Sequence, residues 1–172
     1  MKGGGLTMFR KVDDFLRTWD YETEATLKTF RALTEASLSE PVAPGGRTLG
    51  AIGWHCVVTI PEMMKRAGIP VTGPAPDAPQ PALAEMVREY EACARVLAAS
   101  LPQRWTDAML AETIPMYGEE WPRGAVLSAL VLHQTHHRAQ MTVLMRQAGL
   151  KVPGIYGPAR EEWAAMNMPP QP

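Results

Sequence analysis

The chain has 172 residues, of which 46% are hydrophobic and 20% are charged, a composition typical of one globular domain with its own hydrophobic core. Its 17 basic and 18 acidic residues give a net charge of -1, so no general positive field would attract nucleic acid. No apolar run approaches the roughly 18 residues that a transmembrane helix needs. We therefore expect a single domain over residues 1–172 that acts on a small-molecule substrate, with neither nucleic acid nor membrane as a partner.

The beginning of the chain and its cysteines indicate a cellular location. Residues 1–6 lack the apolar stretch of a secretory signal peptide. The two cysteines, Cys56 and Cys93, are not in a CxxC spacing, and neither lies in turn-like sequence, so a disulfide framework is not expected. These features predict a reducing, cytoplasmic location.

The first half of the chain is predicted to form two helices. Apolar side chains recur every three or four residues over about residues 7–37, which indicates an amphipathic helix. This helix ends before the loop 41–47, because the prolines and glycines of the loop cannot continue it. Thr48 is a candidate N-cap for a second helix that reaches Ala67, and Pro61 should kink that helix.

The second half adds two long helices and a short one. A proline-rich crossing over about residues 69–81 leads to a third helix at 81–101. The stretch 102–123 shows no clear periodicity, a fourth helix follows at 122–149, and a short helix is expected at 159–166. Alternation of apolar and polar residues is absent over any useful length. The pattern therefore predicts an all-α fold, a four-helix bundle with one long crossover loop and a short C-terminal helix.

Three of the four histidines lie in the fourth predicted helix, and two of them share a face. A spacing of four residues advances a helix by about 400° and about 6 Å, so His133 and His137 lie one turn apart on the same side. Both fall within the apolar stripe of this helix, which predicts that they point into the bundle, whereas Gln134 and Arg138 lie further round. The stripe consists of Val126, Leu130, Met141, Leu144 and Ala148.

Two inward-facing imidazoles in this arrangement suit a divalent metal ion. Burying them is costly unless their nitrogens are satisfied, and one metal ion satisfies both. The alternative is a pair of core histidines that are hydrogen-bonded to neighbouring helices. His55, at the edge of the apolar stripe of the second helix, is either a third ligand or another satisfied core residue. Three imidazole ligands would leave a coordination position open to water or substrate, as in catalytic sites.

Three further residues near the histidines are interpreted more simply. His136 projects about 100° away from its neighbour, so we expect it at the surface or behind the metal ligands. Cys56 is expected to be a small core residue, and Glu62 to be solvated. No general base is apparent beside the three histidines, which makes hydrolysis the less supported reaction.

The segments that carry these histidines resemble a known family. The segment 133–158 is similar to the final helix and loop of DinB-like proteins, the DNA-damage-inducible family that is also grouped with the YfiT-like metal-dependent hydrolases. The segment 49–55 is similar to the part of the family's second helix that bears its first metal ligand. The resemblance covers the chain from about Val12 to Trp163 and is most specific in the fourth helix.

The resemblance implies an up-down-down-up four-helix bundle that forms a homodimer and binds a divalent metal ion through His55, His133 and His137. Imidazole ligands favour zinc or nickel, with iron or manganese as alternatives. Some members of the family are thiol-dependent, which implies a thiol-S-transferase-like activity with a low-molecular-weight thiol cofactor. Three alternatives stay open: a metal-dependent hydrolase, a non-catalytic stress-response binding module, and a structural bundle whose histidines are only hydrogen-bonded.

Overall fold

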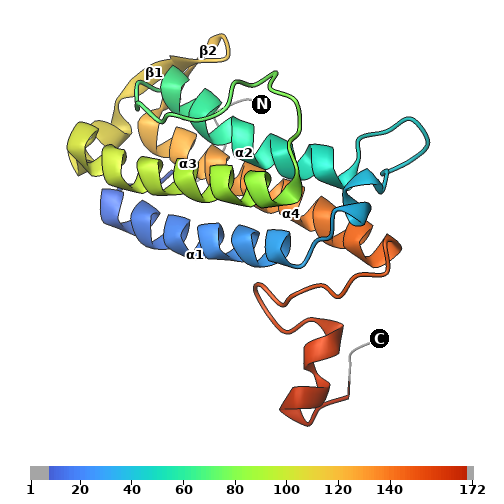
Figure 1. Ribbon diagram of the computed structural model, residues 1–172. Helices are drawn as coiled ribbons and strands as arrows, with labels where there is room; N and C mark the ends of the chain where they lie inside the picture. The colour runs from blue at the N-terminus through green and yellow to red at the C-terminus, as the bar shows by residue number, and fades with distance from the viewer. Residues whose placement is uncertain (1–7, 170–172) are drawn as a thin grey trace.

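The structure is a computed structural model that describes residues 8–169. Four long helices dominate it and pack side by side (Figure 1). They are α1 (Val12–Arg31), α2 (Leu49–Arg66), α3 (Leu83–Arg104) and α4 (Arg123–Gln147). The predicted all-α four-helix bundle is confirmed. No helix within residues 8–169 combines the length and the apolar character needed to cross a membrane.

Contacts between α1 and α4 show that these two helices are parallel. Near the start of both, the backbone N–H of Phe9 donates to the carbonyl of Gly124 at 3.2 Å. Further along both helices, Arg138 of α4 forms an ion pair with Glu22 of α1. The two helices therefore run in the same direction along the bundle.

α2 is antiparallel to α4 and parallel to α3. Ile52 near the start of α2 lines a cavity together with Leu144 near the end of α4. Gly53 lies against Met86, so the starts of α2 and α3 meet. The two parallel helices are joined by the long crossover at residues 67–82, which runs along one side of the bundle in Figure 1. The resulting order of directions is up-down-down-up, as the family resemblance implies.

Local hydrogen bonds explain where the first two helices begin and end. The hydroxyl of Thr48 accepts a hydrogen bond from the backbone N–H of Ala51 at 3.2 Å, which confirms Thr48 as the N-cap of α2. The prediction that the first helix extends to residue 37 was wrong. Thr34 and Ser37 exchange side-chain to backbone hydrogen bonds, which compete with helix continuation, and a 3-10 turn at Ala36–Ser39 follows instead.

A β-hairpin lies in the stretch for which no periodicity was found. Strands β1 (Thr113–Met116) and β2 (Glu119–Pro122) pair in antiparallel register. Tyr117 and Gly118 connect them with φ angles of 52° and 85°, the left-handed pair that a two-residue hairpin turn requires. Trp121 is 1% exposed, so the hairpin is anchored to the core by its inner face.

The last part of the chain departs from the predicted helix at 159–166. Two separate 3-10 turns stand there, at Arg160–Glu162 and Ala164–Met166. Asn167 ends the second turn with a left-handed φ of 54°. This C-terminal segment extends away from the four helices in Figure 1, so it has little packing to support a continuous helix. Cys56 and Cys93 are buried and form no disulfide, as expected.

Candidate metal centre

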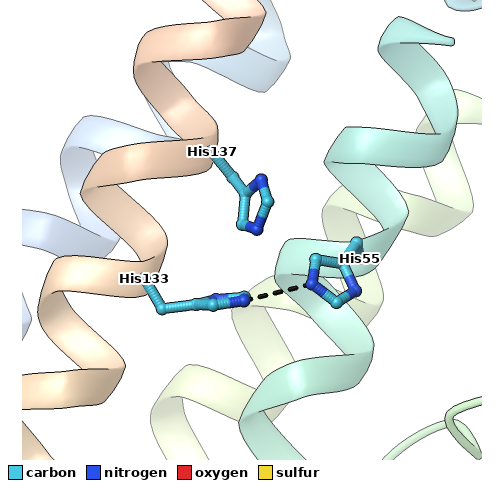
Figure 2. A group of neighbouring side chains, drawn as sticks. All are labelled: His55, His133 and His137. Carbon is cyan, nitrogen blue, oxygen red and sulfur yellow. Dashed lines mark hydrogen bonds between the residues drawn. The ribbon is translucent and has the colours of Figure 1, made fainter. Parts of the chain in front are cut away.

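The structure brings together His55 of α2 and His133 and His137 of α4. One ring nitrogen of each histidine lies within 4.8 Å of the corresponding nitrogens of the other two. The Nε2 atoms of His55 and His133 are 3.1 Å apart, and the three rings converge on one point between the helices (Figure 2). The side chain of Gln134 fixes this register, because it donates a hydrogen bond at 2.9 Å to the carbonyl of Cys56, which follows His55.

The surroundings keep the three imidazoles neutral at pH 7. Burial lowers the pKa of His55 to about 4, and the positive field of Arg47 adds to this shift. Burial and the neighbouring His137 likewise lower the pKa of His133 to about 4. Burial also lowers the pKa of His137, against a hydrogen bond with Gln140 that raises it. Neutral imidazole is the form that binds metal ions, so no proton has to be removed first.

Gln140 fixes the orientation of one of these rings. Its amide oxygen accepts a hydrogen bond from Nδ1 of His137 at 2.8 Å, and its amide nitrogen donates to Nε2 of His136 at 3.1 Å. With Nδ1 protonated, the lone pair on Nε2 of His137 stays free. Metal-binding histidines are commonly held in this way by a partner on the second nitrogen.

The three histidines are better arranged to bind a divalent ion than to form hydrogen bonds with one another. Within residues 8–169, the buried Nδ1 of His133 has no hydrogen-bond partner, and one hydrogen bond joins the ring to His55. Two imidazole nitrogens bound to one zinc ion, each at about 2.1 Å, lie at most about 4.2 Å apart. The observed separation of up to 4.8 Å therefore requires only a small inward movement of the side chains.

A cavity of about 600 Å³ opens beside His55 and His133. We call it the hairpin-side cavity, because Tyr117 and Trp121 of the β-hairpin form part of its wall. Most of its lining surface is apolar and comes from Val58, Met63, Pro76, Trp121 and Ala129. Its size and apolar walls are typical of sites for small molecules.

Glu62 lies in this cavity, which corrects the expectation that it is simply solvated. Its side chain is 22% exposed and accepts hydrogen bonds from Arg66 at 3.0 Å and from the hydroxyl of Tyr117 at 2.6 Å. The guanidinium of Arg66 also lies 4.7 Å from the centre of the Tyr117 ring. The hairpin is therefore tied to the end of α2, and a carboxylate shares a cavity with two of the histidines. The spacing of seven residues from His55 was the only signal for it in the sequence.

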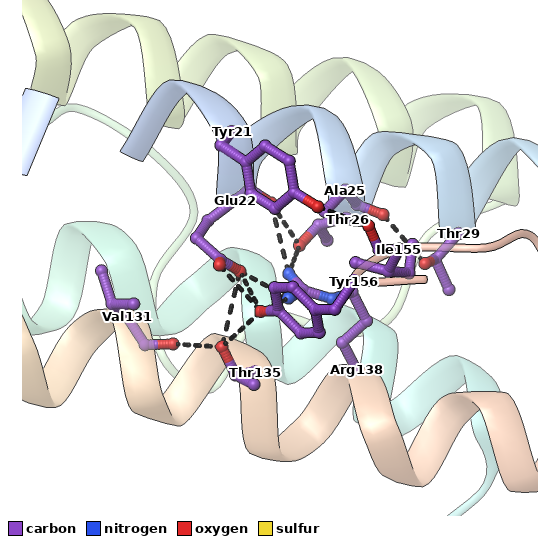
Figure 3. Close-up of polar contacts among 10 residues, drawn as sticks. All are labelled: Tyr21, Glu22, Ala25, Thr26, Thr29, Val131, Thr135, Arg138, Ile155 and Tyr156. Atoms are coloured by element: carbon purple, nitrogen blue, oxygen red, sulfur yellow. Dashed lines mark hydrogen bonds and ion pairs between the residues drawn. The ribbon is translucent and has the colours of Figure 1, made fainter. Parts of the chain in front are cut away.

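Arg138, which helical spacing placed outside the buried stripe, is 2% exposed. Its guanidinium pairs with the carboxylate of Glu22 and donates to the hydroxyl of Thr26 at 3.0 Å (Figure 3). The hydroxyl of Tyr156, from the C-terminal segment, donates to Glu22 at 2.7 Å. We call Glu22, Thr26, Arg138 and Tyr156 the Arg138 cluster. It joins α1, α4 and the C-terminal segment on the side of α4 that faces away from α2.

Two other expectations agree with the structure. His136 is exposed at the surface; its ring is hydrogen-bonded to Gln140 and packs edge-on against the ring of His137, and it is not one of the three converging histidines. Cys56 is completely buried in the core. Burial raises the pKa of the Cys56 thiol to about 12, so this cysteine is not a nucleophile.

Comparison with known proteins gives a consistent assignment. The model of the DinB family matches residues 8–171. The uncharacterized protein YrdA of Bacillus subtilis (strain 168) is 43% identical over 162 residues, which cover 94% of this chain and 97% of YrdA.

Two solved structures are similar over most of the chain. A crystal structure of a DinB-like protein from Bacillus cereus ATCC 10987 has a TM-score of 0.83 and 41% identity, and the match covers 87% of this chain and all of that one. YfiT from Bacillus subtilis, described as a probable metal-dependent hydrolase with an unusual four-helix bundle topology, has a TM-score of 0.62. It is 15% identical, over 86% of this chain and 93% of YfiT, so it supports the fold alone.

Proposed function

The chain belongs to the DinB family, and from this premise we propose that it is a metal-dependent enzyme in which His55, His133 and His137 bind one divalent ion. The reaction that the site supports best is a thiol-S-transferase-like group transfer to a small molecule. One observation carries the proposal: three imidazoles from two helices converge, and two of them line an apolar cavity of about 600 Å³. Three protein ligands leave at least one coordination position for a substrate atom.

A bound divalent ion lowers the pKa of a coordinated thiol or water and so supplies a nucleophile at neutral pH. The protein contributes position and environment. Gln140 holds the ring of His137 so that Nε2 is available. The apolar walls, with Trp121 and Met63 among them, exclude water from an acceptor molecule in the hairpin-side cavity. Thiol transfer would need no protein acid or base beyond this, because the thiol gives its proton to solvent before the reaction. The sulfur then forms the new bond to the acceptor as the leaving group departs with its electron pair.

Metal-dependent hydrolysis is the second candidate reaction, and Glu62 is the observation that favours it. Hydrolysis needs a group that takes a proton from the attacking water. Glu62 lines the same cavity as His55 and His133, and its two hydrogen-bonding neighbours hold the carboxylate in place. The description of YfiT as a probable hydrolase, on a related fold, is consistent with this candidate.

The ligand set is compatible with several divalent metal ions, and we propose the cofactors on general grounds. Three imidazoles suit zinc or nickel best, and iron or manganese less well. We propose a low-molecular-weight thiol as the second cofactor. We also propose a homodimer, in which Leu132 on the outer face of α4, 51% exposed, packs against a second copy. Light scattering coupled to size-exclusion chromatography tests this, and a monomeric mass would contradict it.

The first experiment is the metal content of untagged protein, measured by mass spectrometry of its elements. We expect about one divalent ion per chain in the wild type, and none in His133→Ala or His137→Ala. His136→Ala is the matched control, because it removes a neighbouring imidazole that lies outside the site, and it should retain the ion. A wild type without metal, even after zinc or nickel is added, would overturn the proposal and leave a non-catalytic binding module.

The second experiment separates the two reactions. The metal-loaded protein is assayed for conjugation of a small thiol to an electrophilic aryl halide and for hydrolysis of an activated ester. We expect conjugation in the wild type, unchanged in rate by Glu62→Gln. Hydrolysis without conjugation, reduced by Glu62→Gln, would replace the transferase with the hydrolase.

A further inference from the structure

A second cavity, of about 390 Å³, lies in the same groove between α2 and α4. Whereas the hairpin-side cavity is lined by His55 and His133, this one is lined by His137. The loop 41–47, which projects from the opposite end of the bundle from the hairpin in Figure 1, supplies its outer wall. We call it the loop-side cavity. The three histidines therefore stand between two cavities rather than at the end of one.

Arg47 gives the loop-side cavity its charge. It is the one charged side chain that lines this cavity, and its guanidinium has no ion pair or hydrogen bond with any other of residues 8–169. Its side chain is exposed to solvent, and it lines the same cavity as His137. A positive guanidinium on the wall of a cavity attracts an anion into it.

Besides Arg47, the polar side chains of His137 and Gln140 line the cavity, and most of the remaining wall is apolar. Ile52 of α2 and Val143 and Leu144 of α4 face the space, together with Val42 of the loop. An inorganic anion such as phosphate would leave these walls in contact with water. The matching ligand therefore combines an anionic head with a short apolar body, since each part then meets a complementary surface.

We propose that the loop-side cavity binds a small amphipathic carboxylate. Its carboxylate pairs with Arg47, whose planar guanidinium can donate two parallel hydrogen bonds. Its apolar body packs against Ile52 and Leu144. A catalytic role for this site rests on the proposed function: group transfer requires two molecules at one reacting centre, and the bound carboxylate would be one of them. Carboxylate recognition by Arg47 does not itself require the metal.

The test is calorimetric binding of hexanoate and of hexanol, which have the same apolar body and differ in the charged head. Both are titrated into metal-free protein and into zinc-loaded protein of known zinc content. We expect the wild type to bind hexanoate at least about tenfold more tightly than hexanol. Arg47→Gln should bind the two equally, and Arg47→Lys should retain part of the preference.

Arg17→Gln is the matched control, because Arg17 is an exposed arginine on α1 whose ion-pair partner is Asp14. It should keep the full preference for hexanoate. Arg47→Gln should fold normally, since the structural hydrogen bond of Arg47 is made by its backbone carbonyl, which accepts from the N–H of Val42 at 2.9 Å. An unchanged melting temperature checks this.

Two results would overturn the inference: equal binding of hexanoate and hexanol by the wild type, including no detectable binding of either, or a preference that survives Arg47→Gln. Failure of the proposed function looks different. A protein that never takes up zinc, yet prefers hexanoate through Arg47, would contradict the metal centre and leave the carboxylate site standing.

Discussion

His137 and Arg138 are neighbours in the sequence, yet they belong to polar clusters of opposite character. Arg138 faces α1, where Glu22, Thr26 and Tyr156 provide hydrogen-bond partners, and the charged side chains of the pair are only 3% and 7% exposed. His137 faces α2, where three imidazoles share few hydrogen bonds and border two cavities. In the Arg138 cluster the buried charges are paired with each other, and Tyr156 covers them from the exposed side; the histidines have free lone pairs beside open space.

This difference separates a structural role from a chemical one. A buried polar cluster whose groups are all paired has no capacity for a ligand, and it serves to fix how helices pack. A cluster with unpaired nitrogen lone pairs beside a cavity contributes little to the stability of the fold until a ligand binds to those nitrogens. The four predictions below test this division.

The largest effect is expected for Arg138→Met. The substitution leaves the carboxylate of Glu22 buried without its cation, which should reduce the free energy of unfolding by about 3–5 kcal/mol. Urea denaturation of the metal-free protein measures it. Arg31→Met, which breaks an exposed ion pair with Glu24, is the control and should cost less than about 1 kcal/mol. Equal losses in the two variants would show that the Arg138 cluster is not a structural element.

Metal removal should have the next largest effect on stability, and this effect should require the three histidines to be intact. Metal bound to the folded state at about 100 times its dissociation constant adds about 2.7 kcal/mol to the free energy of unfolding. A chelator should therefore lower the melting temperature of the zinc-loaded wild type. The melting temperature of His137→Ala should not respond to the chelator. A wild type whose melting temperature is unchanged by chelation would argue against a metal that bridges α2 and α4.

Acidification should destabilise the metal-free protein. The pKa values of His55 and His133 are about 4 in the folded state and ordinarily 6.5, so between these values the unfolded chain binds more protons than the folded one. The free energy of unfolding should therefore fall as the pH is lowered from 6.5 to 4. Because both imidazoles are partly open to solvent, we expect a loss on the order of 2 kcal/mol.

Urea denaturation of the metal-free protein across this pH range measures the loss. The double variant His55→Ala/His133→Ala, which lacks the two imidazoles but retains every carboxylate, serves as the reference. Its free energy of unfolding should fall less steeply over the same range. Identical slopes for the wild type and the double variant would place the pH dependence elsewhere in the molecule.

The smallest effect is expected for Tyr156→Phe. The variant removes the hydroxyl that donates to Glu22 and leaves the buried ion pair intact, so the free energy of unfolding should fall by about 1 kcal/mol. Metal content should stay at the wild-type level. A Tyr156→Phe variant that loses its metal would show that the two clusters are coupled through α4.

The pair His133 and His137 could be predicted from the sequence because its geometry is local. A spacing of four places His133 and His137 on one helix face whatever the rest of the fold does, and His55 followed from the resemblance to DinB-like proteins. Arg138 could not be placed in this way. α4 packs against α1 as well as α2, so residues outside a single apolar stripe, such as Gln134 and Arg138, are also buried.

The residues around the trio could not be predicted, because contacts between distant segments bring them to the site. Glu62 and Arg47 line cavities whose other walls come from the hairpin and from the end of α4. The hairpin itself was missed because each strand has only four residues, too few to show alternation. The dipeptide Tyr117-Gly118 was its available signal, since glycine readily adopts the positive φ of the turn.

The sequence separation of the histidines has a consequence for how the protein matures. His133 lies 78 residues after His55, and the two meet only when α4 has packed against α2. During synthesis, a nascent chain that has released α1, α2 and α3 from the ribosome therefore carries a single histidine of the trio. The complete set forms only after the last helix has emerged and docked. The metal ion that we propose would therefore be acquired late in biogenesis, and a chain truncated before α4 would lack two of its three ligands.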